Sequence, residues 1–116
     1  MTEFTIPIKA ASLTNQRIHW RKKADVAKKQ REAARLHARN TMALYPGHPT
    51  LSVHLTRVGR GVLDDDNLRS SMKSIRDGIA AAWKIDDASP IIRWEYAQRC
   101  SNKEAAVEVK WEWQRL

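Results

Sequence analysis

The sequence has little cysteine and no long apolar segment, and these absences exclude several classes of protein. Cys100 is the only cysteine, which excludes an internal disulfide and a cysteine-based zinc site. No apolar run approaches the roughly 18 residues of a membrane-spanning helix. The N-terminus lacks the charged-then-apolar pattern of a secretion signal, and the histidines show no metal-ligand spacing. We therefore expect a cytoplasmic protein that does not bind a membrane.

The length allows one small domain. A chain of 116 residues can form a hydrophobic core, but a partner subunit would add to its stability. No internal repeat or low-complexity tail divides the sequence. We expect a single domain over residues 1–116.

Positive charge dominates the chain and is concentrated in one segment. The sequence has 21 Lys and Arg against 13 Asp and Glu, a net charge of +8, and residues 15–39 contribute most of the excess. Such a segment is typical of a nucleic-acid-binding surface, although a basic helix face taken alone is as often merely solvated. Trp20 could stack on an unpaired base or pack on the domain edge. The predicted DNA-binding residues are Arg17, Trp20, Arg21, Lys22, Lys23, Lys28, Arg31, Arg35 and Arg39.

Hydrophobic periodicity predicts the order β-α-β-α-β-β. Helical composition runs from Ala24 to about Leu44, after an irregular connection from Ala10 to Lys23. Ser101-Asn102-Lys103 predicts a hairpin between the last two strands. Alternating apolar residues predict strands at residues 3–9, 51–58, 92–96 and 107–113. We expect an α/β fold in which two main helices pack against a mixed sheet of about four strands.

The second helix lies between two acidic clusters. Asp64, Asp65 and Asp66 precede it, and Asp86 and Asp87 follow it. Asp65 or Asp66 could cap the helix, which explains one carboxylate but not three. A strand-like approach would place Asp64 and Asp66 on the same side. Clustered carboxylates suit a hard cation such as Mg²⁺.

The helix itself has an apolar and a polar face. Its apolar stripe consists of Leu68, Met72, Ile75, Ile79 and Ala82, and its other face carries Asp66, Ser70, Lys73 and Asp77. A straight helix of about 17 residues is roughly 25 Å long. Asp66 and Asp87 could therefore share an ion only if the helix ends early near Ala80–Ala82, if the chain folds back, or if a dimer assembles the site.

These motifs resemble the RusA family of Holliday junction resolvases. The similarity consists of D-x-D-N at Asp64, Asp66 and Asn67, then Lys73 and Asp77, then Trp83 and the pair Asp86-Asp87, with a weaker likeness at Ser12-Leu13-Thr14-Asn15. The resemblance implies that Asp64, Asp66 and Asp87 hold Mg²⁺, for which Mn²⁺ may substitute in such enzymes, and that Lys73 assists catalysis. The family lysine can lie one turn earlier, where this sequence has Ser70.

The resemblance implies a bacterial or phage-encoded enzyme that cuts four-way DNA junctions in recombination and repair. It also implies a homodimer, since the junction has paired scissile strands. Two alternatives stay open at this point. One is a DNA-binding module without catalysis, in which the aspartates only cap the helix; the other is a nuclease of the same fold for different branched DNA.

Overall fold

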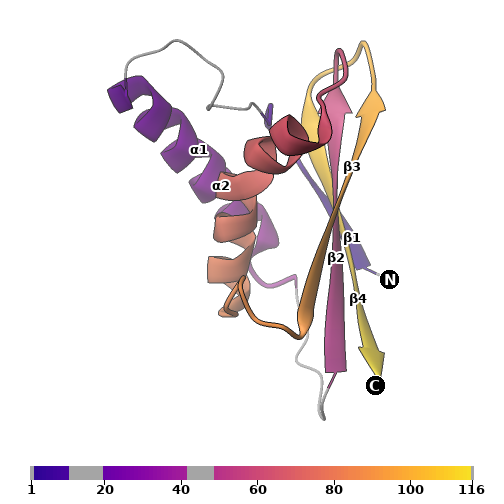
Figure 1. Cartoon of the computed structure of the whole chain (residues 1–116). Coiled ribbons are helices and arrows are strands. Elements are labelled where there is room, and N and C mark those ends of the chain that lie inside the picture. The colour runs from indigo at the N-terminus through magenta and orange to yellow at the C-terminus, as the bar shows by residue number, and fades with distance from the viewer. Residues whose placement is uncertain (1, 11–19, 42–48, 116) are drawn as a thin grey trace.

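The predicted elements form along the chain in the expected order. The computed structural model describes residues 2–10, 20–41 and 49–115. Its elements are β1 (Thr2–Ile6), α1 (Trp20–Ala38), β2 (Pro49–Gly59), α2 (Asp65–Trp83), β3 (Ile92–Cys100) and β4 (Ala106–Arg115). A mixed four-stranded sheet with two helices confirms the α/β prediction (Figure 1). None of the helices in these ranges is long and apolar enough to cross a membrane.

The strand order is β1-β4-β2-β3, so the last two strands are not neighbours. β4 pairs antiparallel with β1 and β2, whereas β3 pairs parallel with β2. The predicted hairpin at Ser101-Asn102-Lys103 is therefore wrong, because this connection crosses the end of β2 to reach its other side. β2 and β3 can pair in parallel because α2 lies between them in the chain. The helix returns the chain to the end of the sheet where β2 begins, so β3 runs in the same direction.

Several element boundaries also differ from the prediction. β1 ends at Ile6 instead of residue 9. The next residue, Pro7, has no N–H to donate to a neighbouring strand. α1 begins at Trp20, so residues 20–23 form a first helical turn instead of an irregular connection. α1 ends at Ala38, and Asn40 follows with a left-handed φ of 64°. Leu44, the expected helix end, lies outside the described residues.

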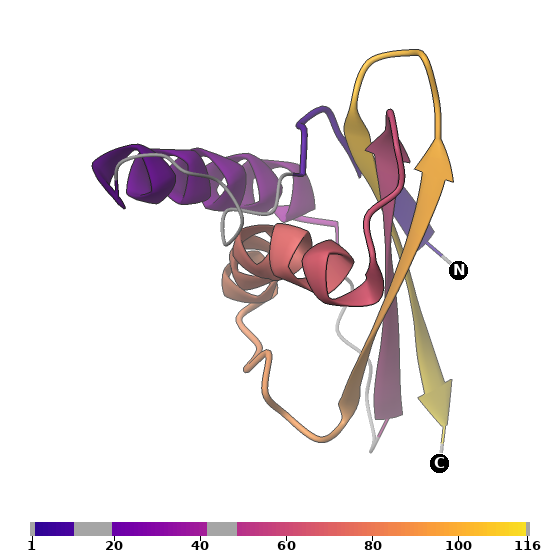
Figure 2. The same cartoon turned by 45° about the horizontal axis from the view of Figure 1, so that its top comes forward.

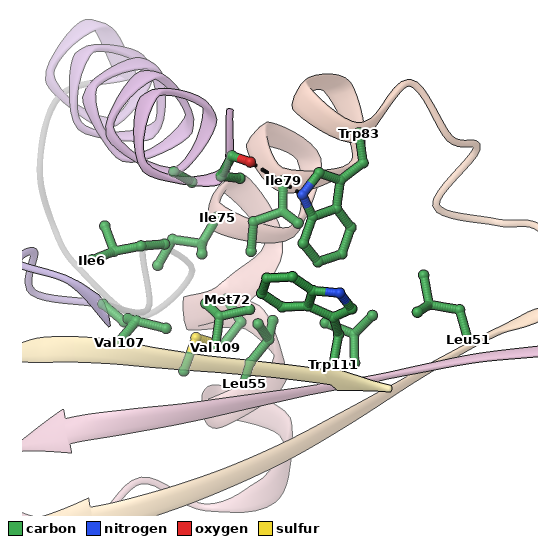
Figure 3. Close-up of a cluster of buried hydrophobic side chains, with 14 of the residues drawn as sticks. Ile6, Leu51, Leu55, Met72, Ile75, Ile79, Trp83, Val107, Val109 and Trp111 are labelled. Atoms are coloured by element: carbon green, nitrogen blue, oxygen red, sulfur yellow. Dashed lines mark hydrogen bonds between the residues drawn. The ribbon is translucent and has the colours of Figure 1, made fainter. Parts of the chain in front are cut away.

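Both helices cover the same face of the sheet, with α2 against the strands and α1 beyond it (Figures 1 and 2). Successive inward positions of β2, namely Leu51, Val53 and Leu55, are fully buried, as period-two alternation requires. The other face is polar and carries ion pairs such as Arg99–Glu108 at 2.8 Å. The core between sheet and helices includes Ile6, Val107, Val109 and Trp111 from the strands and Met72, Ile75 and Ile79 from α2 (Figure 3).

Trp83 ties the two helices and the sheet together. Its indole ring packs 5.0 Å from that of Trp111, measured between centroids (Figure 3). Its Nε1 donates hydrogen bonds to the Ala38 carbonyl at 3.2 Å and to Thr41 Oγ1 at 3.0 Å, just beyond the end of α1. Burying an indole with its N–H satisfied avoids the desolvation penalty of a lost hydrogen bond. The C-terminal ends of α1 and α2 are thereby held against the core.

Candidate functional site

Asp64 caps α2, because the helix begins one residue earlier than expected. Asp64 has extended backbone angles, and its Oδ1 accepts a hydrogen bond from the Asn67 N–H at 2.8 Å. Its Oδ2 accepts a second one from Asn67 Nδ2 at 3.2 Å. The prediction that Asp65 or Asp66 caps the helix is wrong, since both residues already lie in the first turn. There they face the positive end of the helix dipole, which stabilises negative charge.

The early helix start also changes how the three aspartates are arranged. A strand-like approach does not describe them, because the backbone is helical from Asp65 onward. Side chains there turn by about 100° per residue instead of alternating. Asp64, Asp65 and Asp66 are all exposed. The side-chain directions expected for Asp64 and Asp66 are thus corrected, while their proposed role as metal ligands stays a prediction.

α2 continues through Ala80–Ala82, and the chain then folds back along it. Lys84 ends the helix with a left-handed φ of 56°, and the Ile85 N–H bonds to the Ala80 carbonyl at 3.0 Å. The next residues return Asp87 to the middle of the helix, beside Arg76. A fold-back is one of the three expected ways for Asp66 and Asp87 to share an ion, but this one brings Asp87 to Arg76 and not to Asp66.

Arg76 and Trp94 hold Asp87 in this position. Arg76 Nη2 donates to the Asp87 carbonyl at 2.7 Å, and its Nε lies 3.3 Å from Asp87 Oδ2. Trp94 Nε1 donates to the same carbonyl at 3.0 Å. The guanidinium also stacks 4.9 Å from the centre of the Trp94 ring and donates to Tyr96 Oη at 3.0 Å. Because several groups fix it, Asp87 has a defined place on an otherwise irregular segment.

These contacts form the floor of a pocket between α2 and β3, hereafter the α2–β3 pocket. It has a volume of about 530 Å³. Its lining comprises Arg69, Ser70, Lys73, Arg76, Asp77, Asp87, Trp94 and Tyr96. Lys73 and Asp87 thus line the same pocket. Cationic and carboxylate groups lie beside two aromatic rings in this pocket.

Asp77 and Asp87 form a carboxylate pair inside this pocket. Burial raises the pKa of Asp77, and the neighbouring Asp87 carboxylate raises it further, with the two carboxyl groups in hydrogen-bonding reach. Lys73 and Arg76 act in the opposite direction, lowering the pKa of Asp77. Two carboxylates this close repel each other when both are ionised. A cation between them would relieve that repulsion.

The structure divides the predicted acidic residues between two places. Asp87 lies in the α2–β3 pocket, whereas Asp64 and Asp66 do not line it. Across the described ranges no group of three or more His, Cys, Asp or Glu side chains is placed so that it could hold a metal ion. Sequence reasoning placed Asp77 on the right helix face but missed its pairing with Asp87. It missed Arg76 entirely, since nothing local in the sequence links that residue to Asp87.

The predicted DNA-binding residues mostly lie exposed on α1. Lys22, Lys28, Arg31 and Arg39 are exposed, whereas Lys23 is half-buried. Arg35 is half-buried as well and pairs with Glu32 at 3.0 Å. Arg17 lies outside the described residues. This exposure leaves the helix available to a partner without identifying one.

Trp20, the first residue of α1, is largely exposed. Its side chain is 66% exposed, and the Arg21 guanidinium lies 5.2 Å from the centre of its ring. An exposed indole with a cation over it can stack on a base. Base stacking by Trp20 therefore stays a prediction.

The basic helix and the α2–β3 pocket lie on different sides of α2. α1 contacts α2 and the β1 edge of the sheet (Figure 1). The pocket is lined from α2 and from β3, the strand at the opposite edge. A ligand that touches both surfaces must therefore extend across α2. A nucleic-acid duplex is long enough to do so.

Comparison with known protein families, with curated proteins and with solved structures finds no match to this chain.

Proposed function

We propose that this protein is an Mg²⁺-dependent endodeoxyribonuclease, similar to the RusA resolvases, that cuts four-way DNA junctions. The observation that carries the proposal is the Asp77–Asp87 carboxylate pair, held in an open pocket beside Lys73 and Arg69. Acidic groups that could take a cation lie next to basic groups that could take a phosphate. This combination is what hydrolysis of a phosphodiester requires.

The carboxylate pair is suited to Mg²⁺. Proteins usually hold this ion with one or two carboxylates, and waters and substrate phosphates complete its coordination. Asp77 and Asp87 supply such a pair, while Asp64 already serves as a helix cap. Asp66 lies on the same helix face but eleven residues before Asp77, about 16 Å along the axis, so it cannot bind the same ion as this pair. When present, the ion would lower the pKa of a bound water and offset charge on the phosphate.

The other pocket residues would position the substrate. Arg76 and Trp94 orient Asp87 through its carbonyl and carboxylate. Lys73 stands one helical turn before Asp77, where its ammonium can offset the charge that builds up on the phosphate. Exposed Arg69 lies in the same lining and can contact a neighbouring phosphate. These roles depend on charge and placement instead of base identity, which favours recognition of DNA shape.

The exposed cations of α1 would bind the duplex arms. Every phosphate neutralised by Lys or Arg releases condensed counterions, so binding should weaken steeply as salt rises. Trp20, exposed at the start of the helix, could stack on bases that are unpaired near the crossover. The chain would then act as a homodimer, with one pocket for each of the two scissile strands.

A binding module without catalysis is the second candidate, and one observation favours it. Asp64 has both carboxylate oxygens engaged by Asn67, which is what a purely structural aspartate would show. In that case the protein would bind junctions but not cut them. A nuclease for other branched DNA is a third candidate, and substrate comparison separates it from the first.

Cleavage of a synthetic four-way junction with Mg²⁺ tests the proposal. We expect paired, symmetric nicks near the crossover, and little cutting of linear duplex or flapped DNA. Asp87→Asn should reduce cutting by more than about 100-fold, beyond the usual effect of losing an outer-shell metal partner. Junction binding should stay equal or tighten, because the substitution removes repulsion of phosphate.

Glu104→Gln is the matched control, since it removes one exposed carboxylate from a loop outside the pocket. It should cut normally. Tight junction binding without cutting in Mg²⁺ or Mn²⁺ would replace the proposal by the binding module. Loss of binding together with cutting in Asp87→Asn would count against a metal-ligand role for that residue.

A further inference from the structure

An arginine occupies a position of β2 where the pattern calls for an apolar residue. Leu51, Val53 and Leu55 point into the core, and the next inward position is Arg57. Its side chain is only 7% exposed. Charged side chains are rarely this buried unless something compensates their charge. The local surroundings of Arg57 show only part of that compensation.

Three backbone carbonyls hold the Arg57 guanidinium. Nε donates to Ala10 at 3.4 Å, Nη1 to Gly61 at 3.4 Å and Nη2 to Arg60 at 3.3 Å. These are long bonds to neutral acceptors, and no carboxylate in the described ranges forms an ion pair with Arg57. A guanidinium has five N–H groups. Two of them, and the positive charge itself, are left for another partner.

Arg57 lines a pocket whose ionisable side chains are all cationic. The pocket has a volume of about 240 Å³, and its lining includes residues from the end of β2 and from the β3–β4 connection. β1, β2 and β3 all finish at this end of the sheet (Figures 1 and 2). Its charged lining consists of Lys9, Arg57, Arg60 and Lys103. No acidic residue of the described chain lines it. Four cations that converge on one space repel each other unless an anion lies between them.

The basic pocket is separate from the α2–β3 pocket. The two share no lining residue. Gly61 and Arg60, which bond to Arg57, lead directly into Asp64 at the start of α2. A ligand in the basic pocket would thus lie near the N-terminal end of the helix that carries the proposed catalytic face.

We propose that the basic pocket binds a phosphate group. Guanidinium and ammonium groups together suit a phosphate, because the guanidinium supplies directed N–H donors and the lysines supply mobile charge. If the proposed function is correct, this phosphate belongs to the DNA backbone. The site would then anchor the strand at a distance from the carboxylate pair. A free phosphate or nucleotide presents the same chemistry, and the experiment separates the two sources.

Arg60→Ala combined with Lys103→Ala provides the test variant. Both side chains are exposed, so their removal should leave the fold intact. Arg57 is less suitable, because its three carbonyl bonds organise the loop that leads to α2. Arg93→Ala, which removes an exposed cation on β3 outside the basic pocket, is the control for loss of a surface cation.

The first arm measures inorganic phosphate by thermal unfolding of the full chain at constant ionic strength. A ligand that binds only the folded state raises its melting temperature. We expect phosphate to do so for the wild type and for Arg93→Ala, but not for the double variant. Equal shifts in all three proteins, or none in any, would overturn phosphate binding in this pocket.

The second arm measures binding of duplex DNA as a function of salt. Loss of one phosphate contact should reduce the slope of log affinity against log salt by about 0.9 in the double variant, beyond any change in Arg93→Ala. Such a change assigns the phosphate to DNA. A phosphate response without a slope difference supports the site and assigns it to a free phosphate or nucleotide. If the wild type binds no DNA, the proposed function fails, while the first arm still decides the basic pocket.

Discussion

Asp64 shows how one side chain can satisfy a motif for a purely local reason. It matches the first position of a catalytic pattern, yet both of its oxygens accept hydrogen bonds from Asn67 at the start of α2. A carboxylate in this place can serve either as a helix cap or as a metal ligand. Metal binding needs the negative charge of the side chain, whereas helix capping does not. Asparagine therefore caps about as well as aspartate but is a poor metal ligand.

Substitutions of Asp64 separate these roles. Asp64→Ala should lower the free energy of unfolding by about 1 kcal/mol through loss of the cap, whereas Asp64→Asn should leave it nearly unchanged. Urea unfolding measures both, with Glu104→Ala as the reference for loss of an exposed carboxylate. If Asp64 is only a cap, Asp64→Asn also cuts junctions normally. A stable Asp64→Asn variant that no longer cuts would establish a ligand role.

Asp77 should make the protein less stable when it is ionised. Its pKa in the folded state is raised above the ordinary value of 3.8 by burial and by Asp87. The folded state therefore binds this proton more tightly than the unfolded chain does. The stabilisation from protonated Asp77 is fully present below the ordinary pKa and is lost as the pH rises through the folded-state pKa.

Asp77→Asn should accordingly raise the melting temperature at neutral pH, and the gain should disappear in acid below the ordinary pKa. Differential scanning calorimetry across this pH range measures the effect, with Glu104→Gln as control. Mg²⁺ should stabilise the wild type at neutral pH and should stabilise Asp77→Asn much less. A variant less stable than the wild type at neutral pH would show that the two carboxylates do not repel in solution.

At the scale of elements, the contact between the two helices depends on Gly78. A Cβ built at this position would collide with the backbone carbonyl of Arg31 and would lie 2.9 Å from Ala34 Cβ. Backbone atoms cannot swing aside as a flexible side chain can. The glycine is therefore required by the close approach of α1 to α2, although glycine is otherwise unfavourable inside a helix.

Gly78→Ala should destabilise the protein by about 1–3 kcal/mol, the usual cost of overpacking. Helix propensity alone predicts the reverse, a gain of up to about 1 kcal/mol. The sign of the change in urea unfolding thus decides between them. Ala81→Gly, on the exposed side of α2, is the converse control and should lose about 1 kcal/mol through propensity alone. A stabilised Gly78→Ala would mean that the helices are further apart than the structure shows.

At the scale of the whole molecule, the sequence predicted the elements better than their arrangement. Periodicity is local, so the apolar stripe of α2 and the inward residues of β2 could be read directly from it. Strand order is not local. Ser101-Asn102-Lys103 looks like a hairpin turn, yet α2 had already brought β3 to one side of β2 and left only the other side for β4.

In the candidate site, too, the local features could be predicted from the sequence and the long-range contacts could not. Lys73 and Asp77 could be placed on one face because both lie on α2. The meeting of Asp77 with Asp87 depends on the fold-back after Lys84, and that turn is held by Arg76 and Trp94 from two different elements. Arg57 carried a signal that was available, since it interrupts an apolar alternation. Its meaning required the carbonyls and cations that the fold gathers around it.

Two cuts in one four-way junction require two pockets, and this chain has one α2–β3 pocket in its described part. We therefore expect a homodimer that cuts both strands within one encounter, matching the twofold symmetry of its substrate. A plasmid with an extruded cruciform measures this, because paired cuts give linear product directly whereas independent cuts first accumulate nicked circles. Sedimentation at the same concentrations should give twice the 13.3 kDa chain mass.

Excess Asp87→Asn mixed with the wild type should convert linear product into nicked circles, since mixed dimers keep one working pocket. Linear product that falls without any rise in nicked circles would mean that the two chains do not share a junction.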